Sequence, residues 1–242
     1  MKTPGYRHHA ATHVGWVRPV NEDTLIESPE NHLFGVCDGM GGHAAGEVAS
    51  ALAATVFRRV LAEGVVSPAS ALREAIRQAD EAVYRDQVAH PERQGMGTTL
   101  SALLLSGPAP VEAWIGHVGD SRVYRYRNQK LDQLTIDHSP VFRLYQKGLL
   151  SKEQARRHPH KHIVEQALGL SPPVETDVLA VDVRGGDLFL LCTDGLSDQV
   201  ADDEIEDVCR SGSVRAMARH LVQAANFKGG LDNVSVVLVQ IG

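Results

Sequence analysis

The sequence has few cysteines and no long hydrophobic run. Only three cysteines, Cys37, Cys192 and Cys209, occur in the chain, and so sparse and odd a set predicts no disulfide framework. The longest apolar run lies near 234–239, well below the roughly 18–20 residues that a membrane span needs. The N-terminal stretch lacks the apolar segment of a signal peptide. We therefore expect a cytoplasmic protein with no membrane association.

Positive charge is also scarce. The chain has 24 Lys and Arg against 30 Asp and Glu, which gives a net charge of −6. Nucleic-acid binders carry a basic stripe, so we expect no nucleic-acid partner. An acidic protein also repels an acidic substrate such as a phosphate ester, unless a cation lies between them.

The remaining composition is that of an ordinary globular protein. Hydrophobic residues make up 43% of the chain and charged residues 22%, which excludes a largely disordered protein. No repeat, low-complexity tract or Pro/Gly-rich linker divides the sequence. We therefore predict a single domain over residues 1–242.

Short apolar or alternating segments predict β-strands. Arg122–Arg127 alternates in polarity, and the turn-like pair Asn128 and Gln129 predicts a hairpin to the next strand. The tripeptide 184–186 contains two glycines and predicts a tight turn between two strands. The predicted strands are 33–37, 99–105, 111–118, Arg122–Arg127, 131–135, 174–183, 187–193 and Val234–Ile241.

Helices are predicted between these strands. Ser67 followed by Pro68 is a typical helix start, and Ser151 with Gln154 has capping-box spacing. The predicted helices are 47–62, 68–85, 151–157, Asp202–Cys209 and 213–225, the first with an apolar stripe of Val48, Leu52, Val56 and Val60. Sequential strands favour antiparallel pairing, so we predict an α+β fold with helices packed on sheets.

Four aspartates share one sequence context: Asp38, Asp120, Asp194 and Asp232. Each lies where a predicted strand meets a glycine-containing loop, so the four could converge at one edge of a sheet. Packed carboxylates repel one another and need protons or cations to neutralise them. Mg²⁺ or Mn²⁺ suits such oxygen ligands, and the Gly39 carbonyl is a further candidate ligand. The alternative is that each Asp-Gly pair is simple turn chemistry.

Seven short motifs extend this pattern along nearly the whole chain. In order they are Arg18-Pro19-Val20-Asn21-Glu22-Asp23, Val36-Cys37-Asp38-Gly39-Met40-Gly41-Gly42-His43, Gly97-Thr98-Thr99, His117-Val118-Gly119-Asp120-Ser121-Arg122, Asp137-His138-Ser139, Cys192-Thr193-Asp194-Gly195-Leu196-Ser197-Asp198 and Asp232-Asn233-Val234-Ser235. This series resembles the metal-dependent protein phosphatases, the PPM or PP2C family, in their compact bacterial form.

The resemblance implies a fold and an activity. The fold is an α-β-β-α sandwich, in which two central antiparallel sheets are flanked by antiparallel helix pairs. The activity is hydrolysis of phosphoserine and phosphothreonine in proteins by a water activated between two Mn²⁺ or Mg²⁺ ions. The implied partners are phosphorylated proteins and a bacterial Ser/Thr kinase that the enzyme opposes. The implied oligomeric state is a monomer.

The resemblance also implies roles for single residues. Asp38 bridges the two ions, Asp194 and Asp232 complete the shell of one, and the Gly39 carbonyl binds the other. Asp120, with Asp194, is the implied site of a third ion. Glu22 holds a metal-bound water. Arg18 binds the substrate phosphate, His43 is the general acid, and Asn233 orients water or phosphate nearby.

Residues 138–168 match the mobile flap of the family, with two departures. Pro140 follows Ser139 and restricts that residue to extended conformations. His162 stands where many relatives carry Asn. The spacing of His158, His160 and His162 is compatible with a transition-metal site, but exposed flap histidines are the simpler interpretation.

Two other functions are compatible with parts of the sequence. Cys209 and Arg215 have the Cys-x5-Arg spacing of cysteine-dependent phosphatases, whose loop must follow a strand and precede a helix. Here the segment before Cys209 is a predicted helix, which opposes that mechanism. The second alternative is a pseudophosphatase that binds phosphoproteins without turnover. Such proteins lose metal ligands, whereas Asp38, Asp194 and Asp232 are all present.

Overall fold

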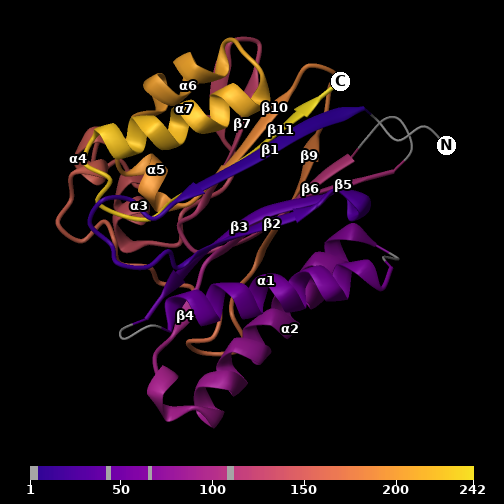
Figure 1. The fold of residues 1–242 in the computed structure, drawn as a ribbon, viewed down its shortest axis with the longest axis vertical. Helices are drawn as coiled ribbons and strands as arrows, with labels where there is room; N and C mark the ends of the chain where they lie inside the picture. Colours follow the sequence, from indigo (N-terminus) through magenta and orange to yellow (C-terminus); the bar gives the residue numbers. More distant parts are fainter. Residues whose placement is uncertain (1–4, 42–44, 65–66, 108–111) are drawn as a thin grey trace.

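The computed structural model describes residues 5–41, 45–64, 67–107 and 112–242 and contains two stacked antiparallel sheets (Figure 1). The first sheet has the order β1 (Tyr6–His13), β11 (Val234–Ile241), β10 (Leu188–Cys192), β7 (Arg122–Arg127) and β8 (Lys130–Gln133). The second has the order β2 (Asp23–Ser28), β3 (Leu33–Met40), β5 (Leu100–Ser106), β6 (Glu112–Val118) and β9 (Asp177–Asp182), and β4 (Gly97–Thr98) pairs with β3.

Helices cover the outer face of each sheet (Figure 1). On the second sheet lie α1 (Gly46–Ala62) and α2 (Pro68–Ala89), and on the first lie α6 (Asp202–Cys209) and α7 (Val214–Phe227). Three short helices, α3 (Pro140–Gln146), α4 (Lys152–Arg156) and α5 (Asp194–Ser197), lie at one end of the sandwich. The predicted α-β-β-α arrangement is confirmed. None of the described helices is long and apolar enough to cross a membrane.

The core has three layers because the central strands are buried on both faces. Val236 and Leu238 of β11 pack with α7, whereas Val237 and Val239 pack between the two sheets. Successive side chains of a strand point to opposite faces, so one apolar strand serves two layers. The same pattern explains why 187–193 and Val234–Ile241 are nearly continuous apolar runs in the sequence.

The most deeply buried stripe of α1 is shifted by one residue from the predicted stripe, in which only Val56 is buried. Ala49, Ala53 and Phe57 are fully buried, whereas Val48 and Leu52 are only partly buried. Small alanine side chains let α1 approach β3 and α2 closely, a preference that counting large apolar residues does not detect.

Both predicted turns are present, but they join different kinds of strand pair. Asn128 and Gln129 have φ angles of 52° and 61°, as a two-residue type I′ hairpin requires, and they join the paired strands β7 and β8. Segment 184–186 also turns, but the strands on either side of it do not form a hairpin. Strand β9 pairs with β6 and β10 pairs with β7 and β11, so the turn carries the chain from one sheet to the other.

Strands β1 and β2 and helix α3 lie outside the predicted elements. The sequence of β1, YRHHAATH, has no apolar alternation, and β1 and β2 each lie at the edge of their sheet. An edge strand keeps polar residues because part of its surface meets solvent.

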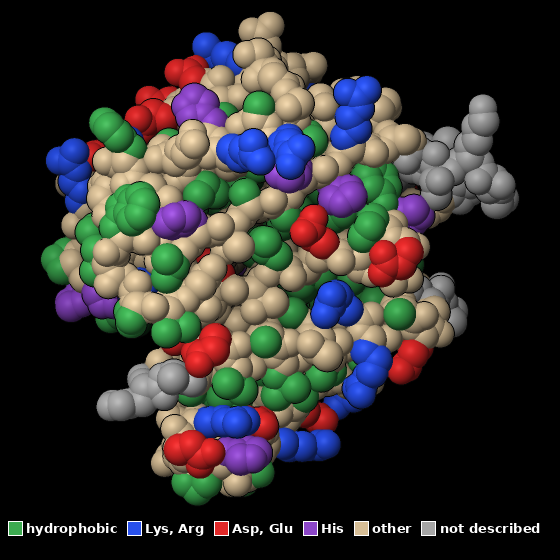
Figure 2. Space-filling model, in the orientation of Figure 1, with side chains coloured by type: hydrophobic (Ala, Val, Ile, Leu, Met, Phe, Trp, Pro, Cys, Tyr) green, Lys and Arg blue, Asp and Glu red, His purple; other side chains and the backbone are tan. Residues whose placement is uncertain are grey.

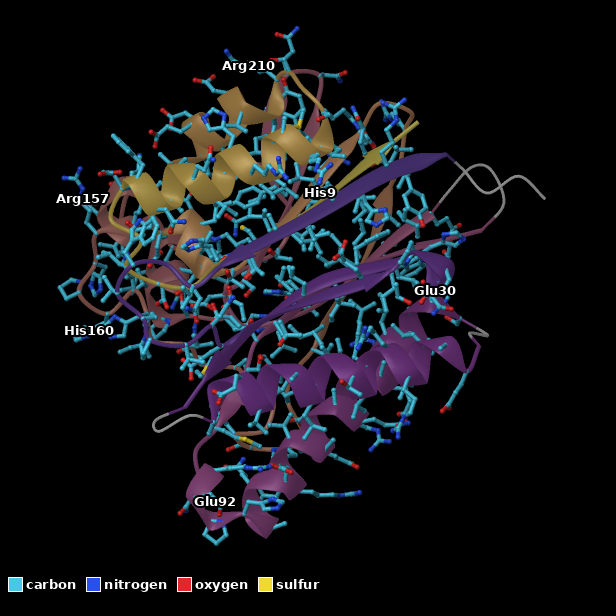
Figure 3. The ribbon with its side chains drawn as sticks, viewed as in Figure 1. His9, Glu30, Glu92, Arg157, His160 and Arg210 are labelled. Carbon is cyan, nitrogen blue, oxygen red and sulfur yellow. The ribbon has the colours of Figure 1, made fainter. Side chains whose placement is uncertain are left out.

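Segment 138–168 contains α3 and α4. Ser139 is extended, with φ −136° and ψ 149°, and its hydroxyl accepts the Phe142 N–H while Pro140 begins α3. Pro140 is therefore a helix-start residue, and the capping box predicted at Ser151 is present. His160 is exposed at the outer edge of this segment (Figure 3).

Candidate metal centre

The structure brings the four predicted aspartates together at one end of the sandwich. Asp38 lies near the end of β3, Asp120 precedes β7, Asp194 begins α5, and Asp232 precedes β11. Burial first, and then repulsion by the neighbouring carboxylates, Asp194, Asp120 and Asp232 among them, raises the pKa of Asp38 well above its usual value. Aspartates that are far apart in the sequence are therefore close enough in the fold to raise one another's pKa.

A fifth carboxylate, Asp23, belongs to the same cluster. It faces Asp38 in the β2–β3 register, and it is the largest source of repulsion on Asp38. The Thr193 hydroxyl donates to Asp23 Oδ2 at 2.9 Å, while the buried Oδ1 has no hydrogen-bond partner among the described residues. Burial raises the pKa of Asp23 to about 7. Asp23 lies within the first of the seven motifs, but nothing in the sequence assigns it a role, because β2 lies outside the predicted strands.

Asp194 and Asp120 form the other side of the cluster. Burial, then repulsion from Asp120, Asp198 and Asp232, raises the pKa of Asp194 well above its usual value. Burial, then repulsion from Asp137 and Asp198, raises the pKa of Asp120 to about 7, with Arg122 opposing this rise. Asp198, which follows α5, is thus an additional member of this side.

The composition of the cluster fits hard divalent cations. All its donors are oxygens, the type that Mg²⁺ and Mn²⁺ prefer. Among the described residues, no group of three or more His, Cys, Asp or Glu side chains is arranged to hold an ion by itself. Mg²⁺ usually keeps several waters in its shell, so the protein need not supply a complete cage of ligands. Carboxylates that are packed together and repel one another are the state that such ions relieve.

The backbone around Asp38 is held by two threonines of the Gly97-Thr98-Thr99 motif. The Thr98 hydroxyl and the Thr99 N–H both donate to the Asp38 carbonyl at 2.9 Å. The Asp38 N–H donates to the Thr99 hydroxyl at 3.0 Å. These three bonds fix the end of β3 and therefore the direction of the Asp38 side chain.

Gly39 lies where no side chain fits. A Cβ atom there would lie 2.1 Å from the Gly46 carbonyl oxygen and 2.5 Å from the Glu22 carbonyl oxygen. The close approach brings the start of α1 against the end of β3. Glu22 also lies here, and burial, followed by the charge of Glu47, raises its pKa.

Loop 14–22, which joins β1 and β2, carries Arg18 and is fastened by Asn233. The Asn233 amide N–H groups donate to the Val14 and Val20 carbonyls at 2.9 Å each, and its Oδ1 accepts the Glu22 N–H at 2.8 Å. Asn233 is only 4% exposed. Both of its N–H groups are thus committed to the backbone, and the structure uses this residue to position the loop.

Arg18 reaches back to the carboxylate cluster. Its Nη2 donates to Asp232 Oδ2 at 2.8 Å, and its side chain is about half exposed. That hydrogen bond is the main cause of the raised pKa of Arg18. A solvent-accessible guanidinium therefore lies directly beside the buried acids. His43, the predicted general acid, lies outside the described residues.

A cavity of about 380 Å³ adjoins the Asp120 side of the cluster. Phe142 and Tyr145 of α3 and Arg156 of α4 line it opposite Asp120 and Asp194. Lys161 pairs with Asp198 at 2.7 Å, which ties segment 138–168 to the end of α5. The predicted flap segment therefore forms one wall of a cavity that opens on the carboxylates.

The family model described as protein phosphatase 2C matches residues 19–231. The chain belongs to the protein phosphatase 2C family. It is 37% identical over 235 residues to the serine/threonine phosphatase stp of Listeria welshimeri, a match that covers 93% of this chain and 92% of that one.

Solved structures of this family share the fold at high similarity. The Mycobacterium tuberculosis serine/threonine phosphatase PstP/Ppp has a TM-score of 0.90 and 35% identity, over 98% of each chain. The catalytic domain of PstP in complex with two manganese ions has a TM-score of 0.88 and 34% identity, also over 98% of each chain. The predicted family and fold class are thereby confirmed.

Cys209 does not have the surroundings of a phosphatase nucleophile. It is the last residue of α6, is 3% exposed and packs in the apolar layer under α6 and α7. Burial raises the pKa of its thiol to about 12, whereas a nucleophilic cysteine needs a lowered pKa. No strand precedes it in this part of the described chain, so the phosphate-binding loop of cysteine phosphatases is absent there.

We expect Cys209→Ser to retain phosphatase activity, with kcat/KM within about twofold of the unsubstituted protein, because the thiol touches no reacting group. Steady-state hydrolysis of p-nitrophenyl phosphate with Mn²⁺ is the measurement. Cys209→Ala is the control for loss of packing, and thermal unfolding of both variants separates damaged folding from damaged chemistry. Loss of turnover in both folded variants would restore the cysteine mechanism.

Proposed function

We propose that this chain removes phosphate from phosphoserine and phosphothreonine in proteins with the help of Mn²⁺ or Mg²⁺. The observation that carries the proposal is the half-buried carboxylate cluster around Asp38, which has an exposed cation, Arg18, at its edge. As a member of the protein phosphatase 2C family, the chain is a PPM-type hydrolase of serine/threonine phosphoproteins. The manganese-bound structure of PstP supports two ions in the core site.

The chain offers ligands for these ions at the positions that the motifs mark. Asp38 would bridge the two ions, Asp194 and Asp232 would complete one shell, and the Gly39 carbonyl would serve the other. Asp120, with Asp194, would hold a third ion. When bound, such ions lower the pKa of coordinated water and neutralise the phosphate charge. They also remove the mutual repulsion of the carboxylates and make an acidic cleft attractive to an anion.

Arg18 is suited to hold the phosphate group. The planar guanidinium fork matches two phosphate oxygens, and only its Nη2 is bonded to a described side chain, that of Asp232. The remaining N–H groups can donate to a phosphate without breaking this bond. Asp232 therefore fixes the direction of Arg18 before substrate arrives.

Glu22 and His43 would handle water and protons. The Glu22 backbone is fixed by Asn233 through its N–H and by Gly39 and Ser50 through its carbonyl, so its carboxylate is positioned to orient a water. His43 would donate a proton to the serine or threonine oxygen as it leaves, since imidazole transfers protons near neutral pH.

The proposed setting is a cytoplasmic monomer whose residues 1–242 form one catalytic domain with a flap over 138–168. Its partners would be phosphorylated proteins and the Ser/Thr kinase that modifies them. The cavity wall formed by α3 and α4 supports a role of the flap in substrate approach.

We expect turnover to depend strictly on a divalent ion, because the carboxylates alone repel the phosphate that they must receive. The measurement is hydrolysis of p-nitrophenyl phosphate and of a phosphothreonine peptide in Mn²⁺, in excess EDTA, and after Mn²⁺ is restored. Activity should be lost in EDTA and recovered with Mn²⁺. Full activity in EDTA would contradict the proposal, and absence of turnover with Mn²⁺ would favour a phosphoprotein-binding pseudophosphatase.

A further inference from the structure

Five of the eleven large hydrophobic side chains that are exposed in the described structure come from two short segments beside Arg18. They are Trp16, Val17, Val20, Phe227 and Leu231, with exposures of 68%, 63%, 44%, 93% and 55%. Figure 2 shows exposed hydrophobic side chains on the left of the molecule, where Figure 1 places the β1–β2 loop and the end of α7. Contiguous exposed apolar surface marks binding sites more often than isolated exposed residues do.

The two segments lie side by side through a series of contacts. The Trp16 N–H donates to the Gly230 carbonyl at 2.7 Å, and the Arg18 Nη2 donates to Asp232 Oδ2 at 2.8 Å. The space between the segments is so small that a Cβ atom on Gly15 would lie 2.4 Å from the Asp232 carbonyl oxygen. The two segments therefore lie side by side next to Arg18. We call their exposed residues Trp16, Val17, Val20 and Leu231 the apolar rim.

The indole of Trp16 is fixed although most of it is exposed. Its Nε1–H donates to the Asn226 carbonyl at 3.1 Å, and its ring meets the His13 ring edge to face at 5.0 Å between centroids. A ring that is held in place loses little conformational freedom when a partner binds. An aromatic side chain that is exposed to solvent and also held in place by a hydrogen bond is typical of a binding surface.

We propose that the apolar rim binds the apolar side chains next to the phosphorylated residue of the substrate protein, so that the enzyme prefers phosphosites with apolar neighbours. This inference rests on the proposed function. Trp16 and Val17 immediately precede Arg18, so a chain whose phosphate is held by Arg18 has its neighbouring residues over the rim. The Arg18 guanidinium within the apolar surface complements a phosphorylated peptide, which presents one anion among apolar side chains.

The test compares two phosphothreonine peptides that carry either leucine or serine at the two positions on each side of the phosphothreonine. We expect the unsubstituted enzyme with Mn²⁺ to prefer the leucine peptide by about tenfold in kcat/KM, the low end for an apolar contact at an enzyme site. In the double variant Val17→Ser/Leu231→Ser this preference should fall to about twofold or less. Because each preference is a ratio within one enzyme preparation, a change in the amount of active enzyme cancels.

Val88→Ser is the matched control. Val88 is 66% exposed, close to the value for Val17, but it lies in α2 on the second sheet, and its variant should keep the tenfold preference. Equal rates for the two peptides with unsubstituted enzyme would overturn the proposal, as would an unchanged preference in the double variant. A concentration-dependent dimer that the double variant dissolves, detected by light scattering, would assign the rim to a second copy of the chain instead. Failure to hydrolyse p-nitrophenyl phosphate with Mn²⁺ would count against the proposed function itself.

Discussion

Replacement of Asp38 by asparagine is expected to lower kcat/KM by about a thousandfold or more, because the carboxylate proposed to bridge two ions becomes a neutral amide. The same change should stabilise the metal-free protein. Asp38 is half-buried among Asp23, Asp194, Asp120 and Asp232, all of which raise its pKa, so the loss of one charge relieves their repulsion. Opposite effects on activity and stability distinguish a metal ligand from a residue that merely supports the fold.

The measurements for Asp38→Asn are steady-state kinetics in Mn²⁺ and thermal unfolding in EDTA. Asp207→Asn is the matched control, since Asp207 is 66% exposed in α6 and, among the residues that the structure describes, pairs only with Arg210 at the surface. It should change neither quantity appreciably, because exposed ion pairs contribute little. An Asp38→Asn protein that is less stable than the unsubstituted protein in EDTA, or that retains activity, would contradict the proposed cluster.

The metal-free protein is expected to lose stability as the pH rises from 5.5 to 8. Asp23 and Asp120 have pKa values of about 7 in the folded chain, against an ordinary value of 3.8. The folded state thus binds these protons more tightly than the unfolded chain does. Stability is therefore highest where both carboxyl groups are protonated in the fold, and it is lost as the pH passes from about 4 through about 7.

The expected loss between pH 5.5 and pH 8 is on the order of 4 kcal/mol, or roughly 10 °C in unfolding temperature for a chain of this size. Two histidines act in the opposite direction, and one of them is His9, whose pKa is lowered first by burial. Burial lowers the pKa of His117 to about 3, so the cost of keeping it neutral grows as the pH falls below its unfolded value, and this reduces the net effect.

Thermal unfolding in EDTA across this pH range measures the loss, and the same series in saturating Mn²⁺ is the control. With Mn²⁺ the dependence should reverse, because protons compete with the ions for the carboxylates and metal affinity rises with pH. A metal-free protein whose stability increases steadily from pH 5.5 to 8 would contradict the pKa values assigned to Asp23 and Asp120.

Local patterns are sufficient to predict the aspartates of the site and an α+β fold with helices packed on sheets, whereas the sandwich of two sheets is what the family resemblance implies. Asp38, Asp120 and Asp194 each lie next to glycine at the end or beginning of an apolar strand, and such a pattern needs only a few neighbouring residues. The alternation in Arg122–Arg127 and the long apolar runs of β10 and β11 likewise express burial on one or two faces within a single segment.

Asp23 shows where such patterns are insufficient. It opens a short edge strand whose ends are polar, and its burial arises only because β2 pairs with β3 and places it opposite Asp38. Asn233 is a similar case, since its amide binds backbone groups more than 200 residues away in sequence. The composition of each segment contains no information about such a pairing.

The sequence by itself thus determined the family, the sandwich of two sheets, and the aspartates that were expected to meet. Only the tertiary structure decided that β9 and β10 lie in different sheets, that Asp23 joins the cluster, and that two segments with exposed apolar residues lie side by side next to Arg18. The physical reason is that periodicity and turn chemistry act over a few residues, whereas burial and charge repulsion depend on contacts between segments that are distant along the chain.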